Sequence, residues 1–217
     1  MSTNNQLAMR PPRISSSVAA LTLDMIERCL VIGLSLCLLH RLWMAGMGLG
    51  LTLLAISEGL NVVFTLIRRP SRQFSLRPAA WLLAFGASAA PLCVIPTGLT
   101  PSPAQLFATA ILATAGVLMQ ISAKLTLGRS FGMVPANRGL RLSGPYRLVR
   151  HPMYLGYMLA HLGFVLSNPT GWNLAVYGIA YACQIPRLLA EEKLLSNDDT
   201  YREYQTQVPF HLIPGVF

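Results

Sequence analysis

Residues 104–127 read AQLFATAILATAGVLMQISAKLTL, a stretch that is apolar almost throughout and carries one charged side chain, Lys124. A transmembrane helix needs about 20 predominantly apolar residues. This stretch is therefore long enough to cross a bilayer with some tilt. Residues 43–67 form a second long apolar stretch that meets the same criterion. Together the two stretches predict an integral membrane protein.

The composition of the whole chain supports this prediction. Of its 217 residues, 53% are apolar and 12% are charged, and the mean hydropathy is +0.49. Soluble domains carry about a quarter charged residues, so a soluble globular protein is excluded. The net charge of +9 results from 17 basic and 8 acidic residues. With so much apolar sequence, this basic excess indicates a membrane surface rather than nucleic acid as the partner.

Six apolar segments can be drawn, which fits one membrane domain over residues 1–217. They are residues 21–39, 43–67, 79–95, 104–127, 154–166 and 172–189. The first contains the charged residues Asp24, Glu27 and Arg28, and the fifth is short. We expect an all-α bundle of six transmembrane helices, or five if the last two segments form a re-entrant hairpin. Residues 1–20 would be a cytoplasmic tail, 21–127 the first four spans and 128–217 the catalytic part with a cofactor pocket.

Basic residues alternate between the connections of this six-span arrangement, as the retention of Lys and Arg in cytoplasmic loops requires. They cluster in the tail, between the second and third segments, between the fourth and fifth segments, and in the C-terminal region (Arg10, Arg13; Arg68, Arg69, Arg72, Arg77; Arg129, Arg138, Arg141, Arg147, Arg150; Arg187, Lys193, Arg202). The opposite connections contain only Arg41. This pattern predicts that both termini are cytoplasmic.

Three smaller features also give expectations about the helices. Arg28 and Lys124 lie near span ends, where their charged heads can reach the interface. Gly46 and Gly50 form a small-x-x-x-small pair that suits close helix packing. The four cysteines form no C-x-x-C pair, so neither a metal site nor a disulfide framework is expected.

Polar residues concentrate in 128–151 and 190–217, on the predicted cytoplasmic face. The first of these stretches runs into Gly144-Pro-Tyr-Arg-Leu-Val-Arg-His-Pro-Met-Tyr-Leu-Gly156. Pro152 suits the first turn of a helix, and Tyr154 and Gly156 would fall in the same turn. A helix N-terminus can bind an anionic group of a ligand. The alternative is a turn at the membrane surface, with Arg and Tyr at the headgroup level.

The second polar stretch begins near Arg187-Leu-Leu-Ala-Glu191-Glu192. Because Arg187 and Glu191 are four residues apart, they share one helical face. They either pair with each other, as an interfacial ion pair of little energetic value, or together face a ligand.

These motifs resemble the isoprenylcysteine carboxyl methyltransferase family. The resemblance rests on G-x-Y at 144–146, R-H-P-x-Y-x-G at 150–156, R-x-x-x-E-E at 187–192 and Y-x-x-Y-x-x-x-V-P at 201–209. It covers the chain from about residue 127 onward. Four weak motifs in the right order are specific together, whereas the first three segments resemble nothing in particular.

The resemblance implies a membrane enzyme that binds S-adenosylmethionine and methylates a lipophilic or lipid-linked acceptor. Arg187 and Glu191 would be the catalytic residues, with Arg187 facing the acceptor and Glu191 also contacting the cofactor. The other cofactor-binding residues would be Tyr146, His151, Pro152, Met153, Tyr154 and Gly156. No metal and no nucleic acid are implied. A carboxylate acceptor could be held by a bidentate hydrogen-bond fork from Arg187, and no general base would then be needed.

Other functions remain open from the sequence. Sterol reductases that use a nicotinamide cofactor also carry an R-H-x-x-Y element, phospholipid N-methyltransferases share the cofactor, and a non-enzymatic membrane protein is a third class. His161 is expected to bond between helices. Glu58 and Asn61 are costly in lipid and should face the bundle or a cavity, where they could serve acceptor access. The acceptor and the oligomeric state cannot be derived from the sequence.

Overall fold

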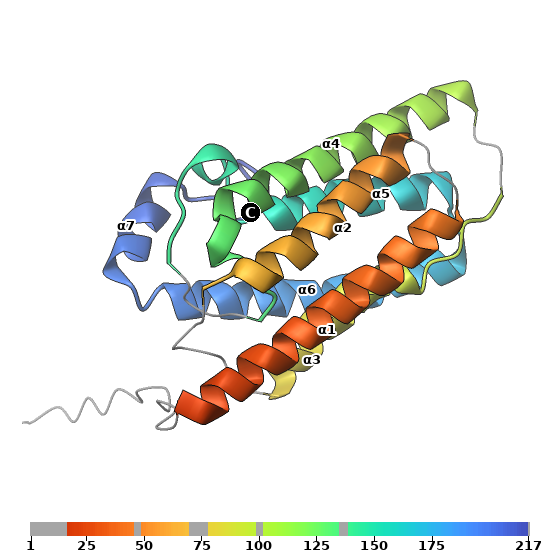
Figure 1. The fold of residues 1–217 in the computed structure, drawn as a ribbon. Coiled ribbons are helices and arrows are strands. Elements are labelled where there is room, and N and C mark those ends of the chain that lie inside the picture. The colour runs from red at the N-terminus through yellow and green to blue at the C-terminus, as the bar shows by residue number, and fades with distance from the viewer. Residues whose placement is uncertain (1–16, 46–48, 70–77, 99–101, 135–138, 217) are drawn as a thin grey trace, which may run out of the picture.

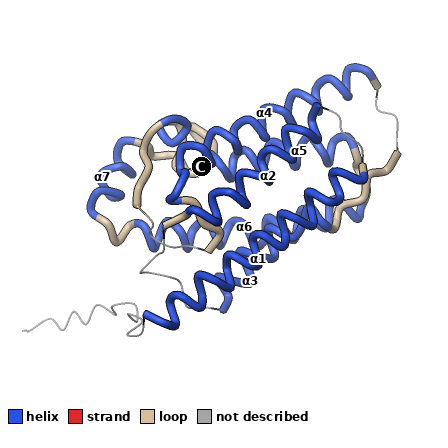
Figure 2. Tube along the Cα trace, in the orientation of Figure 1, coloured by secondary structure: helices blue, strands red, loops and turns tan. Residues whose placement is uncertain are grey.

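The computed structural model describes residues 17–45, 49–69, 78–98, 102–134 and 139–216. Its α-helices are α1 (Ser17–Met44), α2 (Leu49–Ile67), α3 (Pro78–Ala89), α4 (Pro103–Leu127), α5 (Pro152–Ser167), α6 (Gly171–Leu195) and α7 (Asp199–Gln207). Three short 3-10 helices, η1 (Ala90–Leu92), η2 (Gly128–Ser130) and η3 (Gly144–Arg147), follow α3, follow α4 and precede α5. The described ranges contain no strand (Figure 2), which confirms the all-α prediction.

Each of the six apolar segments corresponds to one helix, although the boundaries differ from the prediction. Capping residues explain two of the starts, because Ser102 and Thr170 accept hydrogen bonds from the backbone N–H groups of Gln105 and Asn173. The last of the six, α6, continues to Leu195, beyond the predicted end at residue 189. It therefore carries the R-x-x-x-E-E motif on the helix itself. The predicted tail, Arg72, Arg77 and Arg138 lie wholly or largely outside the described residues.

The six long helices alternate in direction along the bundle (Figure 1). At one end of the bundle, the Arg28 side chain of α1 donates hydrogen bonds to the last carbonyls of α2. At the same end, the Arg129 Nε donates to the Ile67 carbonyl over 3.0 Å. At the other end, Arg41 of α1 donates to the Val94 carbonyl over 3.2 Å, and the Trp172 indole donates to the Cys93 carbonyl over 2.8 Å. The described basic residues therefore lie mostly at one end, which α7 also occupies, while Arg41 lies at the other.

Helices α4 and α5 approach each other most closely, along small residues. A Cβ atom added to Gly116 would lie 2.5 Å from the Ala160 nitrogen, and one added to Gly156 would lie 2.7 Å from the Gly116 carbonyl oxygen. The small-residue contact is therefore made by Gly116 and Gly156. The expected packing role of Gly50 is wrong, because a Cβ atom added there would have nothing within 4 Å. Gly46 lies outside the described residues.

The outer surface of the bundle is apolar, and its interior contains buried polar side chains beside apolar ones. Large apolar side chains such as Phe107, Leu82 and Ile179 are 70%, 74% and 67% exposed. By contrast, Gln120 and Asn173 are buried at 2% and 0% exposure. Such an apolar outer surface matches hydrocarbon rather than water. By length and composition, the helical stretches Leu49–Ile67 and Pro103–Ser130 could each cross a membrane.

One of the two basic side chains expected to reach the interface, Lys124, points into the bundle instead. Lys124 is fully buried, and its ammonium group donates to the Ser57 carbonyl and hydroxyl over 3.0 and 2.7 Å. It points inward because α2 packs against α4 at this level and supplies those oxygens. Arg28 binds the Asp24 carboxylate over 2.6 Å and the carbonyls that end α2. Oxygen atoms of α2 therefore take the place of the membrane interface for Lys124.

The close approach of α4 and α5 predicts that Gly116→Ala destabilises the bundle. The added methyl group would meet backbone atoms of α5 that cannot move independently, which should cost about 1–3 kcal/mol. Thermal unfolding in a mild detergent measures the loss. Gly33→Ala is the matched control, since nothing lies within 4 Å of that position in α1. Equal midpoints for the two variants would contradict this account of the packing.

Candidate active site

The turn that leads into α5 depends on one glycine. Gly144 has φ +58°, a conformation that side chains disfavour, and a Cβ atom there would lie 2.9 Å from the Thr126 hydroxyl oxygen. The turn continues as η3 and buries Tyr146. The following backbone pairs with the C-terminal segment, because the Arg150 and His151 N–H groups donate to the Phe210 and His211 carbonyls, each over 2.9 Å. The G-x-Y and R-H-P motifs therefore form one folded segment that leads into the start of α5.

Glu192, near the end of α6, connects the segment before α5 with α7. Its Oε1 atom lies 2.6 Å from His151 Nε2 and 3.3 Å from Arg150 Nε, and it accepts a hydrogen bond from the Tyr201 hydroxyl over 2.8 Å. Its Oε2 atom accepts from the Gln205 amide, also over 2.8 Å. One buried carboxylate thus connects α5, α6 and α7.

The charge state of Glu192 follows from these partners. Burial raises the pKa of its carboxyl, but hydrogen bonds from His151, Tyr201 and Gln205 outweigh burial and lower that pKa from 4.5 to about 2. Glu192 lies beyond the predicted end of the sixth span and is an anion at neutral pH. Burial and the Glu192 charge together raise the pKa of the Tyr201 hydroxyl well above its usual range. Tyr201 therefore remains a hydrogen-bond donor.

The two tyrosines of the last motif share one face of α7. Tyr204 donates its hydroxyl hydrogen to the Tyr146 carbonyl over 2.6 Å. Both α7 tyrosines pack with Val208 in a small apolar cluster that also contacts Leu195. The spacing Y-x-x-Y-x-x-x-V accordingly serves to fasten α7 against α6 and the Gly144 turn.

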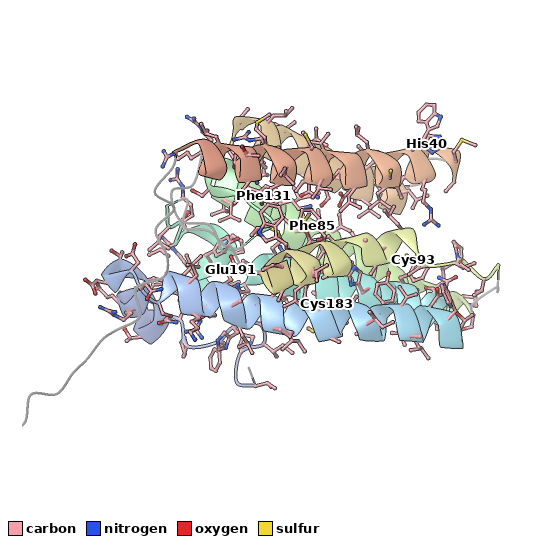
Figure 3. All side chains as sticks on the ribbon, turned by 90° about the horizontal axis from the view of Figure 1, so that it is seen from below. His40, Phe85, Cys93, Phe131, Cys183 and Glu191 are labelled. Carbon is pink, nitrogen blue, oxygen red and sulfur yellow. The ribbon has the colours of Figure 1, made fainter. Side chains whose placement is uncertain are left out.

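A cavity lies between these elements, at the end of the bundle where Figure 3 labels Glu191, opposite His40. Its empty space, including the open mouth, is about 870 Å³, within the size range of small-molecule sites. We call it the cofactor cavity, because residues expected from the sequence to bind a cofactor line it. Six of the residues singled out from the sequence line it, namely Tyr146, His151, Met153, Tyr154, Arg187 and Glu191. The structure thus brings residues from three separate motifs to one place.

Pro152 and Gly156, the other two predicted cofactor residues, do not line this cavity. Pro152 is buried at the first position of α5, where its fixed φ favours the helix start. Gly156 faces α4, and a Cβ atom there would lie 2.7 Å from the Gln120 side chain. The structure therefore gives both residues a packing position behind the cavity wall.

Arg187 and Glu191 meet around the ring of Tyr154. The Tyr154 hydroxyl donates to Glu191 Oε2 over 2.9 Å, and the Arg187 guanidinium lies 5.3 Å from the centre of the same ring. No ion pair joins Arg187 to Glu191 among the described residues. Instead, Arg187 is buried and its Nε atom has no hydrogen-bond partner there. Both side chains line the cofactor cavity.

A second cavity, which we call the inner cavity, lies between α1, α2, α3, α5 and α6. It is lined by Ser35, Glu58, Asn61 and His161, among others, and has about 660 Å³ of empty space including its opening. Glu58 accepts hydrogen bonds from Ser35 over 3.1 Å and from Asn61 over 2.9 Å. The prediction that Glu58 and Asn61 face the bundle or a cavity is confirmed. The expected interhelical bond of His161 is also present, 3.1 Å from the Tyr181 hydroxyl.

The two cavities share three lining residues, Met133, Tyr157 and Arg187. Sequence reasoning did not single out Met133 or Tyr157. Tyr157 could have been found, because it lies one helical turn after Tyr154 on the same face of α5. Met133 gives no local signal, since its position depends on contacts with α1. In the described part of the chain, no group of three or more His, Cys, Asp or Glu could hold a metal ion.

The fold and the site together describe a helical membrane protein with a cavity at the basic end of its bundle. Residues 103–202 match the family model of phospholipid methyltransferases. The match covers somewhat under half of the chain, from the start of α4 into α7, and includes the residues that line the cofactor cavity from α5 and α6. It supports a membrane methyltransferase of this family without distinguishing it from the isoprenylcysteine carboxyl methyltransferases. No curated protein matches the chain.

The depressed pKa of Glu192 predicts a defined acid sensitivity. Because the folded pKa of about 2 lies below the ordinary 4.5, the anion stabilises the fold above about pH 4.5, and this contribution is lost as the pH falls toward 2. Glu192→Gln should lower the free energy of unfolding by about 1–3 kcal/mol at neutral pH, because it removes a charged hydrogen-bond partner. The stability of this variant should also fall less than that of the unmodified protein when the pH is lowered. Thermal unfolding across this range measures both effects.

Glu203→Gln, on the exposed face of α7, is the control for that experiment. It removes the same charge without touching the buried network. If Glu192→Gln lost as much stability on acidification as the unmodified protein, Glu192 would not be the source of the acid sensitivity.

Proposed function

We propose that the protein transfers the methyl group of S-adenosylmethionine to a lipophilic acceptor. The observation that carries this proposal is the junction of the two cavities at Met133, Tyr157 and Arg187. One cavity presents polar and aromatic groups at the basic end of the bundle. The other lies between apolar helices, where a lipid-linked molecule could place its reactive group. A transfer enzyme needs two ligands to meet at such a point.

The groups around the cofactor cavity fit S-adenosylmethionine. The first N–H groups of α5 can receive its carboxylate, since the N-cap residue His151 makes no capping bond with its side chain. Tyr146 and Tyr154 offer aromatic surface for the adenine. Glu191 supplies a carboxylate for the positive charge of the sulfonium. When bound, this cofactor supplies an electrophilic methyl group.

The protein's own contribution to such a transfer is positioning. Tyr154 holds the Glu191 carboxylate, and the unpartnered Nε of Arg187 is available to orient an acceptor. Burial of these groups excludes water from the junction, which strengthens each electrostatic contact. An anionic acceptor such as a carboxylate would bind the Arg187 guanidinium directly. This is the reaction of the isoprenylcysteine carboxyl methyltransferases that the motifs resemble.

A second candidate is N-methylation of a phospholipid amine. The family description favours it, and so does Glu58, whose carboxylate lines the inner cavity beside Asn61. The Asn61 Oδ1 atom is buried without a hydrogen-bond partner. Two acceptor groups at one place suit a ligand that donates hydrogen bonds, such as an amine.

We also propose that all six long helices cross the membrane and that both termini lie in the cytoplasm. The alternating helix directions and the single basic end support this arrangement through the positive-inside rule. The re-entrant alternative would require α5 and α6 to turn back within the bilayer. However, α6 has 25 residues, and its predicted span, residues 172–189, would be about 27 Å long as a helix, close to the thickness of the hydrocarbon core.

The membrane topology predicts opposite labelling of two positions. In a protein without its native cysteines, Thr200→Cys in α7 should react only with a thiol reagent on the cytoplasmic side. Ala104→Cys, in the exposed first turn of α4, should react only from the other side. Labelling of oriented vesicles before and after permeabilisation measures both. Reaction of the two positions from the same side would refute the six-span arrangement.

Substitutions of Glu191 and Arg187 should have separable effects. Glu191→Gln should weaken S-adenosylmethionine binding by about 1–3 kcal/mol, since it removes a charged partner. Arg187→Lys keeps the charge but loses the planar fork, so cofactor affinity should persist while the single-turnover rate falls. Calorimetry and single-turnover methyl transfer measure the two effects. Glu203→Gln and Arg147→Lys, at exposed positions, are the matched controls.

The same preparations distinguish the competing functions. Binding of reduced nicotinamide cofactor in place of S-adenosylmethionine would indicate a reductase. The methyl acceptor can be identified in the same way. Methylation of a prenylated cysteine carboxylate should depend on Arg187, whereas methylation of a phospholipid amine should depend on Glu58 and be slowed by Glu58→Gln. Variants of Arg187 and Glu191 that behave like their controls would leave the proposed function without support.

A further inference from the structure

The first helix contributes a buried carboxylate that binds a segment of the wall of the cofactor cavity. Glu27 of α1 is completely buried, and its Oε1 atom accepts hydrogen bonds from the backbone N–H groups of Met133 and Val134, each over 2.9 Å. These two residues come more than 100 positions later in the chain. Glu27 itself does not line either cavity.

Arg68 pairs with the Glu27 carboxylate and joins it to Asp24, which Arg28 also binds. Arg68, just after α2, places Nη1 at 2.9 Å from Glu27 Oε1 and Nη2 at 2.7 Å from Asp24 Oδ1. Arg28 binds the other Asp24 oxygen over 2.6 Å. Two acids and two bases thus neutralise each other in a buried cluster. Since neither charge of the Glu27–Arg68 pair reaches solvent, leaving either partner alone would be costly.

The segment that Glu27 holds is placed at the junction of the cavities. Met133 lines both cavities, and Val134 lines the cofactor cavity with 1% of its surface exposed. This segment follows η2 and belongs to no helix, so no helical backbone ladder fixes it. A shift of these residues would change the boundary between the two ligand sites.

We propose that Glu27 is a positioning residue, which fixes Met133 and Val134 through its two hydrogen bonds and thereby sets how acceptor and cofactor are aligned. This inference rests on the proposed methyl transfer for its functional consequence. One of the charged residues that interrupt the first apolar segment, Glu27, is thus assigned a role in the site. Glu27 touches neither ligand site and acts only through the backbone of the segment.

Amide hydrogen exchange tests the structural part of this proposal without any turnover. Glu27→Ala should raise exchange in a peptide covering residues 131–134 by about 10-fold to 100-fold, as the loss of charged hydrogen bonds predicts. A peptide from the middle of α4 should not change. Glu27→Gln keeps an oxygen that can accept both bonds, so it should restore much of the protection. It also serves as the test if Glu27→Ala does not fold.

Asp24→Asn is the matched control, because it weakens the same charged cluster but removes no bond to the segment. In single-turnover assays, Glu27→Ala should lower the transfer rate at saturating ligands about 10-fold or more, and Asp24→Asn should lower it less at equal thermal stability. Unchanged exchange at 131–134 in Glu27→Ala, or equal changes in the two variants, would overturn the proposal. Failure of the unmodified protein to bind S-adenosylmethionine would refute the proposed function instead, while exchange would still decide whether Glu27 holds the segment.

Discussion

The buried carboxylate of Glu192 is the interaction on which the candidate site depends. It joins the start of α5, the end of α6 and the face of α7 through His151, Tyr201 and Gln205. A buried charge keeps its hydrogen bonds only while all of these elements stay in place, because each lost partner leaves part of the charge unsatisfied. The adjacent Glu191 is therefore carried by a fixed helix end and can face the cavity, where it accepts a hydrogen bond from Tyr154.

Polar side chains inside the bundle also bind one another between helices at several positions along the bundle axis. Lys124 binds Ser57, Glu58 binds Ser35 and Asn61, and Glu27 binds Arg68 and the Met133 segment. In a hydrocarbon surrounding, such groups are stable only when they face one another across helices. Large apolar side chains cover the outer surface and also fill the space between the polar contacts. The polar contacts, together with the close approach of Gly116 to α5, specify which helices pack together.

The chain also shows how its two halves depend on each other. The family match begins at α4, and the recognised motifs all lie beyond residue 127. Nevertheless, the first three helices supply Ser35 and Glu58 to the inner cavity and Glu27 to the wall between the cavities. The C-terminal half provides the groups proposed to bind the cofactor, and the N-terminal half completes the space that an acceptor would occupy.

The sequence by itself determined the helical class, the six apolar segments and six residues that meet in one cavity. Each of these depends on local information: hydrophobic length decides a helix, and short motifs such as R-H-P-x-Y fix the spacing of side chains along one helix face. Only the tertiary structure decided that Lys124 points inward, that Gly156 packs on Gln120, and that Met133 lies at the junction of two cavities. These placements arise from partners distant in the chain, and neither composition nor periodicity specifies which helix supplies the opposing oxygen or the space for a side chain.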